Sequence, residues 1–212
     1  MDSVELPRLR GVLHLWAFWV ALVAACALVA MAGGARERVA GAVYGAGLCV
    51  LFGGSALYHR WRWSPRWRPL LRRIDHSAIF VFIAASYTPP ALLVLGGPLR
   101  WVVLALVWTG ALGGVAFSVA WIGAPRALAA GCYLALGWVA LIAAPQLVAR
   151  LSPAPLALLA AGGILYTVGA LVYAARRPDP WPRVFGFHEV FHAFVVAAAA
   201  AHFAAMAGWV VA

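Results

Sequence analysis

Seven apolar runs of about 20 residues each divide the sequence and restrict the folds that it can adopt. They lie between clusters of arginine, proline and glycine, at residues 12–32, 39–59, 74–95, 101–121, 127–148, 156–175 and 187–210. Because about 20 apolar residues cross a bilayer as one helix, these runs predict seven transmembrane helices. Little sequence remains outside them, so we expect residues 1–212 to form a single all-α membrane domain.

The distribution of charge supports this membrane interpretation. Hydrophobic residues make up 66% of the chain and charged residues 10%, far from the composition of soluble domains. In a soluble protein, the formal net charge of +10 would indicate binding to nucleic acid. Here the arginines occupy short loops between apolar runs, where membrane topology explains them. We therefore expect membrane lipid, and no nucleic acid, as the partner.

The arginines also predict the orientation of the chain. With a cytoplasmic N-terminus, twelve of the 16 arginines lie on the cytoplasmic side. Cytoplasmic loops of membrane proteins are enriched in arginine and lysine, so the N-terminus is expected inside and the C-terminus outside. In a bacterial cell this describes a multi-pass protein of the inner, or plasma, membrane.

Four ionisable residues gather at helix ends on the expected cytoplasmic side. They are His59 at the end of the second run, Asp75 at the start of the third, and His188 and His192 in the first turns of the last. Ionisable groups in membrane helices are costly and usually mark a functional site. His188 and His192 are four residues apart, so their rings share one helix face. With His59, they form a predicted zinc (Zn2+) site.

Asp75 and Ser55 are the catalytic candidates beside this metal site. Three histidines leave a fourth zinc position open for water, and Asp75 would take the proton of that water. Ser55 lies one turn before His59 on the same face, where its hydroxyl would hold Asp75 or the water. If Asp75 instead coordinates zinc, the site is closed and structural. The sequence leaves both roles of Asp75 open.

Three other histidines are expected to lie outside the site. His76 is turned by about 100° from Asp75 on a helix, so both side chains should not face one centre. His202 lies ten residues after His192, which is roughly 15 Å along a helix. His14 has no partner at a metal-binding spacing and is interpreted as an interfacial residue.

Three separated motifs resemble those of the hemolysin III family, the bacterial branch of the progestin and adiponectin-type receptor group. The motifs are Ser55-Ala-Leu-Tyr-His59, then Arg73-Ile-Asp75-His-Ser with Ser86-Tyr-Thr-Pro89-Pro, and then Phe187-His188-Glu-Val-Phe-His192 followed by His202-Phe. The wider superfamily consists of seven-helix membrane hydrolases and includes alkaline ceramidases. The resemblance implies an N-in, C-out bundle with zinc held by His59, His188 and His192. It also implies that Asp75 holds the zinc-bound water and that Ser55 supports it.

These features predict a zinc-dependent hydrolase that cleaves a lipid amide or ester at the cytoplasmic side, as a ceramidase does. The substrate would enter from the bilayer, because a cavity between apolar helices best accepts an acyl chain.

Two alternatives remain open. One is a lipid sensor, receptor-like regulator or cytolysin in which zinc only braces the helices. The other is an intramembrane protease, because residues 188–192 match the H-E-x-x-H pattern with Glu189 as its base. Relatives in the family carry an uncharged residue at that position, so the glutamate would instead stabilise the start of its helix.

Overall fold

The computed structural model describes residues 7–211, which form α-helices and one π-helical turn. The elements are α1 (Val12–Ala30), α2 (Ala35–Arg60), α3 (Arg68–Pro89), the π-helical turn η1 (Pro90–Val94), α4 (Gly97–Ala120), α5 (Arg126–Gly137), α6 (Ala140–Arg150), α7 (Pro153–Ala175) and α8 (Phe187–Val211). When α3 is counted with η1 and α5 with α6, seven helices are long and apolar enough to cross a membrane. The predicted seven-helix, all-α fold is confirmed.

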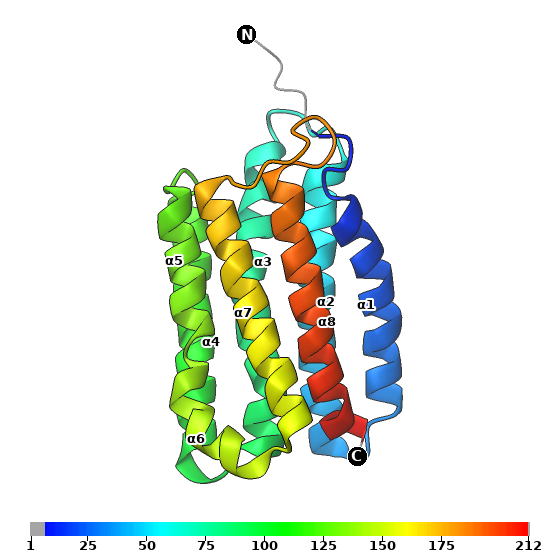
Figure 1. Cartoon of the computed structure of the whole chain (residues 1–212), viewed down its shortest axis with the longest axis vertical. Helices are drawn as coiled ribbons and strands as arrows, with labels where there is room; N and C mark the ends of the chain where they lie inside the picture. The colour runs from blue at the N-terminus through cyan, green and yellow to red at the C-terminus, as the bar shows by residue number, and fades with distance from the viewer. Residues whose placement is uncertain (1–6, 212) are drawn as a thin grey trace.

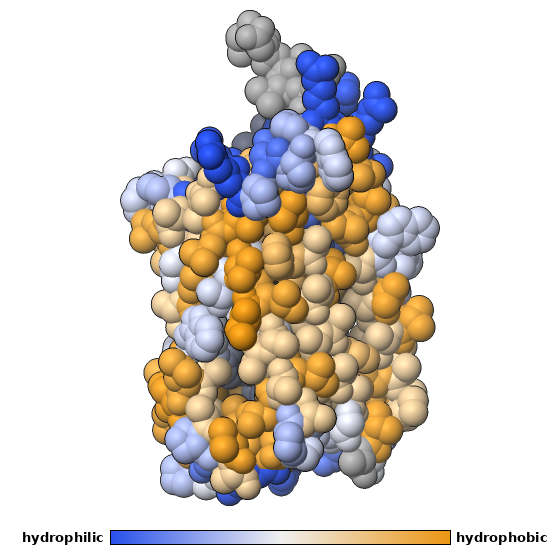
Figure 2. Space-filling model, viewed as in Figure 1, coloured by the Kyte–Doolittle hydropathy of each residue, from blue (hydrophilic) through white to orange (hydrophobic). Residues whose placement is uncertain are grey.

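The helices stand side by side in one bundle, and α1 begins at the end opposite to the one where α8 ends (Figure 1). Apolar side chains cover the middle of the visible face, and polar ones gather at the two ends (Figure 2). This pattern suits a bundle whose middle lies in hydrocarbon and whose loops lie in water. The end of the bundle where α1 begins is called the α1-start end below.

The core brings together the helices that carry the candidate site. Helix α8 packs against α1, α2, α3 and α7, and α2 packs between α1 and α3. One apolar cluster between α1, α2 and α8 includes Tyr44, Phe52 and Met206. A second cluster joins α3 to α4 through residues such as Phe80 and Val107. The ends of α2, α3 and α8 are therefore held in fixed relative positions.

Proline removes a backbone donor and can kink or unwind a membrane helix, so the sequence predicts a disturbance at Pro89-Pro90 and at Pro145. At Pro89-Pro90 the helix widens into η1, where Leu95 N donates to Pro90 O at 2.9 Å. This local change confirms the expectation, because each proline removes a backbone donor. In the fifth span, however, α6 runs through Pro145, and the break lies earlier, at Trp138-Val139.

A side chain from another helix occupies this break. Tyr87 on α3 accepts a hydrogen bond from Ala140 N at 2.7 Å and donates one to Gly137 O. The tyrosine hydroxyl thus satisfies backbone groups on both sides of the interruption, which a bilayer interior would otherwise leave unpaired.

Candidate metal centre

Three histidines converge at the α1-start end of the bundle. His59 comes from the last turn of α2, and His188 and His192 come from the first two turns of α8. Ligand atoms of the three side chains all lie within 4.8 Å of one another. His59 Nε2 and His188 Nε2 are 3.2 Å apart. Two nitrogens on one tetrahedral zinc ion lie about 3.3 Å apart, because Zn–N bonds are about 2.0–2.1 Å long. The separation of the His59 and His188 nitrogens is therefore compatible with a shared metal ion of this kind, and the three side chains could together hold a metal.

The start of α8 is capped by two acidic side chains, which places His188 in its first turn. Glu189 Oε2 accepts from Gly186 N at 2.9 Å, and Asp179 Oδ1 accepts from Phe187 N at 2.8 Å. Both bonds satisfy backbone donors that a helix N-terminus leaves free. The expected stabilisation of this helix start by Glu189 therefore has a specific hydrogen bond.

Asp75, in the second turn of α3, lies beside the three-histidine cluster and is 8% exposed. Its Oδ2 atom is 3.6 Å from His59 Nε2 and 3.4 Å from His76 Nδ1. His76 is not part of the group of ligand atoms found in residues 7–211, as expected. The imidazole of His76 nevertheless contacts the carboxylate of Asp75, which precedes it in the chain.

Ser55 contacts a histidine that the sequence placed elsewhere. Its Oγ lies 2.8 Å from Nδ1 of His14, and both residues are buried. The His14 ring also stacks on His192, with ring centroids 3.7 Å apart and planes 13° apart. The interpretation of His14 as an interfacial residue was therefore wrong, because α1 packs on α2 and α8 and turns this ring inward. The structure shows no direct bond from Ser55 to Asp75.

Arg10 and Glu189, the residue that follows His188 in the chain, form an ion pair that the sequence did not predict. Arg10 Nε is 2.7 Å from Glu189 Oε1, and the Glu189 side chain is 1% exposed. Burial lowers the pKa of the Arg10 guanidinium below its usual value, although the neighbouring Glu189 acts in the opposite direction. The same N-terminal segment is held by Arg8 N, which donates to Arg183 O at 3.0 Å. The segment before α1 is thereby fixed to the loop that leads into α8.

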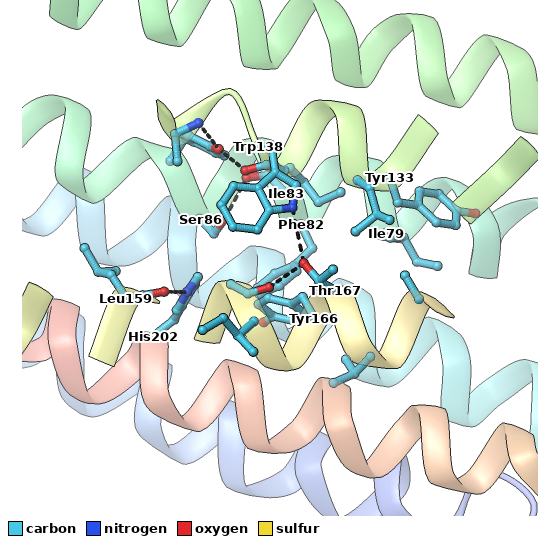
Figure 3. A pocket seen from close by; sticks show the side chains of 18 of the residues that line it. Ile79, Phe82, Ile83, Ser86, Tyr133, Trp138, Leu159, Tyr166, Thr167 and His202 are labelled. Atoms are coloured by element: carbon cyan, nitrogen blue, oxygen red, sulfur yellow. Dashed lines mark hydrogen bonds between the residues drawn. The ribbon is translucent and has the colours of Figure 1, made fainter. Parts of the chain in front are cut away.

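A cavity of about 400 Å³ runs between α3, α5, α6, α7 and α8, and two histidines of the cluster line it. His188, His192 and Asp75 line one end of the cavity, and His202 and Tyr166 line a deeper part (Figure 3). Most of the remaining lining is apolar, with side chains such as Phe82. The volume is in the range of small-molecule sites. His202 does not belong to the cluster, as expected, but it faces the same cavity.

Comparison with known proteins identifies a family and several relatives of the chain. The model of a family described as Haemolysin-III related matches residues 3–203. Over 171 residues the chain is 36% identical to Hemolysin-3 of Bacillus cereus, covering 81% of this chain and 75% of that protein. Over 183 residues it is 37% identical to the Hemolysin-3 homolog of Bacillus subtilis (strain 168), covering 86% and 83%.

The similarity extends beyond bacteria. The Monocyte to macrophage differentiation factor of Homo sapiens is 29% identical over 206 residues, which cover 91% of this chain and 79% of that protein. The seven membrane-crossing helices and the bacterial relatives identify a multi-pass membrane protein. Because the family model matches nearly the whole chain, the protein belongs to the Haemolysin-III related family.

Proposed function

We propose that this protein is a zinc-dependent membrane hydrolase that cleaves a lipid amide or ester. One observation carries the proposal: the three-histidine cluster and a buried carboxylate lie at the end of a largely apolar cavity of about 400 Å³. The cluster supplies a place for a metal, the carboxylate supplies a base, and the cavity accepts an acyl chain.

The residues suit zinc in number and chemistry. Three imidazoles leave one tetrahedral position free, which is the pattern of hydrolytic zinc sites. Nδ1 of His192 is buried without a hydrogen-bond partner in the described chain, so this ring has a free position for a ligand or a second partner. When bound here, zinc would act as a Lewis acid and bring the pKa of a water in the open position to about 7.

Asp75 is proposed as the general base rather than a fourth ligand. Its Oδ2 atom lies 3.6 Å from His59 Nε2 and 3.4 Å from His76 Nδ1. The carboxylate does not belong to the cluster of three candidate metal ligands. From this position it would accept a proton at a carboxylate oxygen when water attacks the substrate carbonyl. Ser55 would act indirectly, since its hydroxyl bonds to His14, which stacks on His192.

The acyl group would reach the site from the bilayer, because the cavity lies between membrane-spanning helices. The excess of arginine at the α1-start end supports a cytoplasmic position for the site in a bacterial inner membrane.

Glu189 gives no support to the protease alternative. Its two oxygens pair with Arg10 Nε and Gly186 N rather than with the cluster. A non-catalytic sensor with a structural zinc is the second candidate, because Asp75 lies close enough to His59 for a small movement to make it a ligand.

The variant Asp75→Asn distinguishes a hydrolase from a non-catalytic sensor. Wild type and variant are purified, their zinc is measured by elemental analysis, and each is incubated with bacterial lipid extract while released fatty acid is quantified by mass spectrometry. The hydrolase predicts unchanged zinc and a fall in turnover of about 100-fold or more, which is the contribution of a general base. The sensor predicts that zinc content and thermal stability fall together.

Glu37→Gln is the matched control, because this carboxylate lies in the first turn of α2, at the other end of the helix from His59. It should leave zinc content and turnover unchanged. A wild type that holds zinc but releases no fatty acid from any extract would contradict the hydrolase.

A further inference from the structure

The deeper part of the cavity contains a second pair of polar side chains, far from the three-histidine cluster. His202 on α8 reaches across to α7, where its Nε2 lies 3.1 Å from Leu159 O (Figure 3). Gly162 makes this approach possible, because a Cβ there would overlap the imidazole. Tyr166 lies one turn further along α7, with its ring centroid 5.4 Å from that of His202. We call His202 and Tyr166 the deep polar pair.

The hydrogen-bonding state of His202 follows from its contact with α7. A carbonyl oxygen only accepts, so Nε2 must carry the proton. No carboxylate pairs with this ring in the described chain, and an isolated charge at this depth would be costly, so the ring is neutral. Its Nδ1 is then an acceptor. That atom is buried without a partner.

Tyr166 completes the pair with a hydroxyl that is also buried without a partner among the described residues. Nearby polar groups differ, because Thr167 Oγ1 donates to Gly163 O at 2.8 Å and Trp138 Nε1 donates to Thr167 Oγ1 at 3.2 Å. Of the two polar side chains in this part of α7, Tyr166 therefore lacks a partner and Thr167 has one. Buried polar groups in proteins usually have partners, so the deep polar pair suits a polar atom of a ligand.

We propose that the deep polar pair binds a hydroxyl group carried by the acyl chain of the ligand. The hydroxyl would donate to His202 Nδ1 and accept from Tyr166 Oη, which uses both free positions. A keto oxygen cannot donate to Nδ1, and a methylene can do neither. This inference rests on the proposed function, because it takes the amide or ester end of the same lipid to lie at the three-histidine cluster.

The helix between the two sites defines the position of this hydroxyl. His202 follows His192 by ten residues, which corresponds to about 15 Å along α8. A fully extended chain advances by about 1.2 Å per covalent bond, so about 12 bonds separate the two polar groups. The preferred ligand is a long-chain acyl group with a hydroxyl near its twelfth carbon.

The test is displacement of radiolabelled octadecanoic acid from wild-type protein in nanodiscs. The competitors are unlabelled octadecanoic acid, 12-hydroxyoctadecanoic acid and 3-hydroxyoctadecanoic acid. We expect the 12-hydroxy acid to displace the label at a concentration about fivefold lower than the unsubstituted acid, the effect of one or two net hydrogen bonds. The 3-hydroxy acid should show no such advantage.

Three variants assign this advantage to its residues. Tyr166→Phe and His202→Phe should each reduce it to less than about twofold. Thr167→Val should preserve it, because the hydroxyl removed there is already bonded within the protein. If His202→Phe does not fold, Tyr166→Phe decides alone, since it removes only one oxygen atom.

The outcomes distinguish failure of this hydroxyl-binding site from failure of the proposed hydrolase activity. Equal displacement by the 12-hydroxy and unsubstituted acids would overturn the inference, as would an advantage that survives both phenylalanine variants. An advantage that depends on Tyr166, in a protein that releases no fatty acid from any extract, would support the inference and contradict hydrolysis. Failure of wild type to bind octadecanoic acid would overturn the acyl-binding cavity, and with it both proposals.

Discussion

The ion pair between Arg10 and Glu189 gives a prediction whose size follows from its burial. In Glu189→Gln, the amide oxygen can still accept from Gly186 N, but Arg10 loses its counter-charge. Removing one partner of a buried pair costs about 3–5 kcal/mol. The Arg10 side chain remains 15% exposed, so solvent relieves part of this cost. We expect a loss of about 3 kcal/mol, at the lower end of that range.

A double-mutant cycle isolates the pair. Arg10→Met should also destabilise, because it leaves the Glu189 carboxylate buried without a cation. The double variant Arg10→Met/Glu189→Gln should be more stable than the sum of the two single losses predicts, with a coupling of about 2 kcal/mol or more. Arg8→Met is the matched control, because Arg8 is an exposed arginine of the same segment, and it should change stability little.

Thermal unfolding in detergent, followed by tryptophan fluorescence, measures these effects. For a chain of this size 1 kcal/mol corresponds to a shift in Tm of about 2–4 °C, so Glu189→Gln should lower Tm by about 6–12 °C. All variants must be heated at one rate, because irreversible unfolding makes Tm depend on the rate of heating.

Two results would refute this reasoning. The first is strict additivity in the cycle, which would show that the two charges do not stabilise each other in the folded protein. The second is a Glu189→Gln variant with unchanged Tm and zinc content but no turnover, which would assign the role of catalytic base to Glu189, as the H-E-x-x-H pattern predicts.

Two further predictions concern the metal and the membrane. Purified wild type should contain about one zinc ion per chain and His188→Ala/His192→Ala almost none, by elemental analysis, because two of three ligands are lost; equal zinc in both would remove the metal centre. Alkaline phosphatase fused after Ala212 should be active and a cytoplasmic reporter at that point silent, because the arginine distribution predicts a C-terminus outside; the opposite pattern would invert the topology.

Much of the fold was predictable because each span is encoded locally. A run of apolar residues forms a membrane helix whatever its neighbours are, so seven runs predicted seven helices. The break at Trp138-Val139 was not predictable, because it depends on the Tyr87 hydroxyl from another helix. Pro145 does not mark the position of this break, since α6 continues through it.

The same distinction applies to the candidate site. His59, Asp75, His188 and His192 were expected together because helix ends on one side of a membrane lie at one depth, and the structure brings them together. The contact between His14 and Ser55 was missed because it depends on the rotation of α1 about its own axis. Rotation is weakly encoded in α1, which is apolar around most of its circumference.

The position of the site explains how one protein would combine water with a substrate dissolved in lipid. Hydrolysis needs water, which is scarce in hydrocarbon, and the three-histidine cluster lies at the end of the bundle, near the loops. An acyl chain needs an apolar path, and the cavity extends from the cluster between helices that cross the membrane. The scissile bond of such a lipid would therefore lie at the interface, where both requirements are met. If a hydroxyl near the twelfth carbon of the acyl chain is also bound, the cavity would select its substrate by the distance between two polar groups.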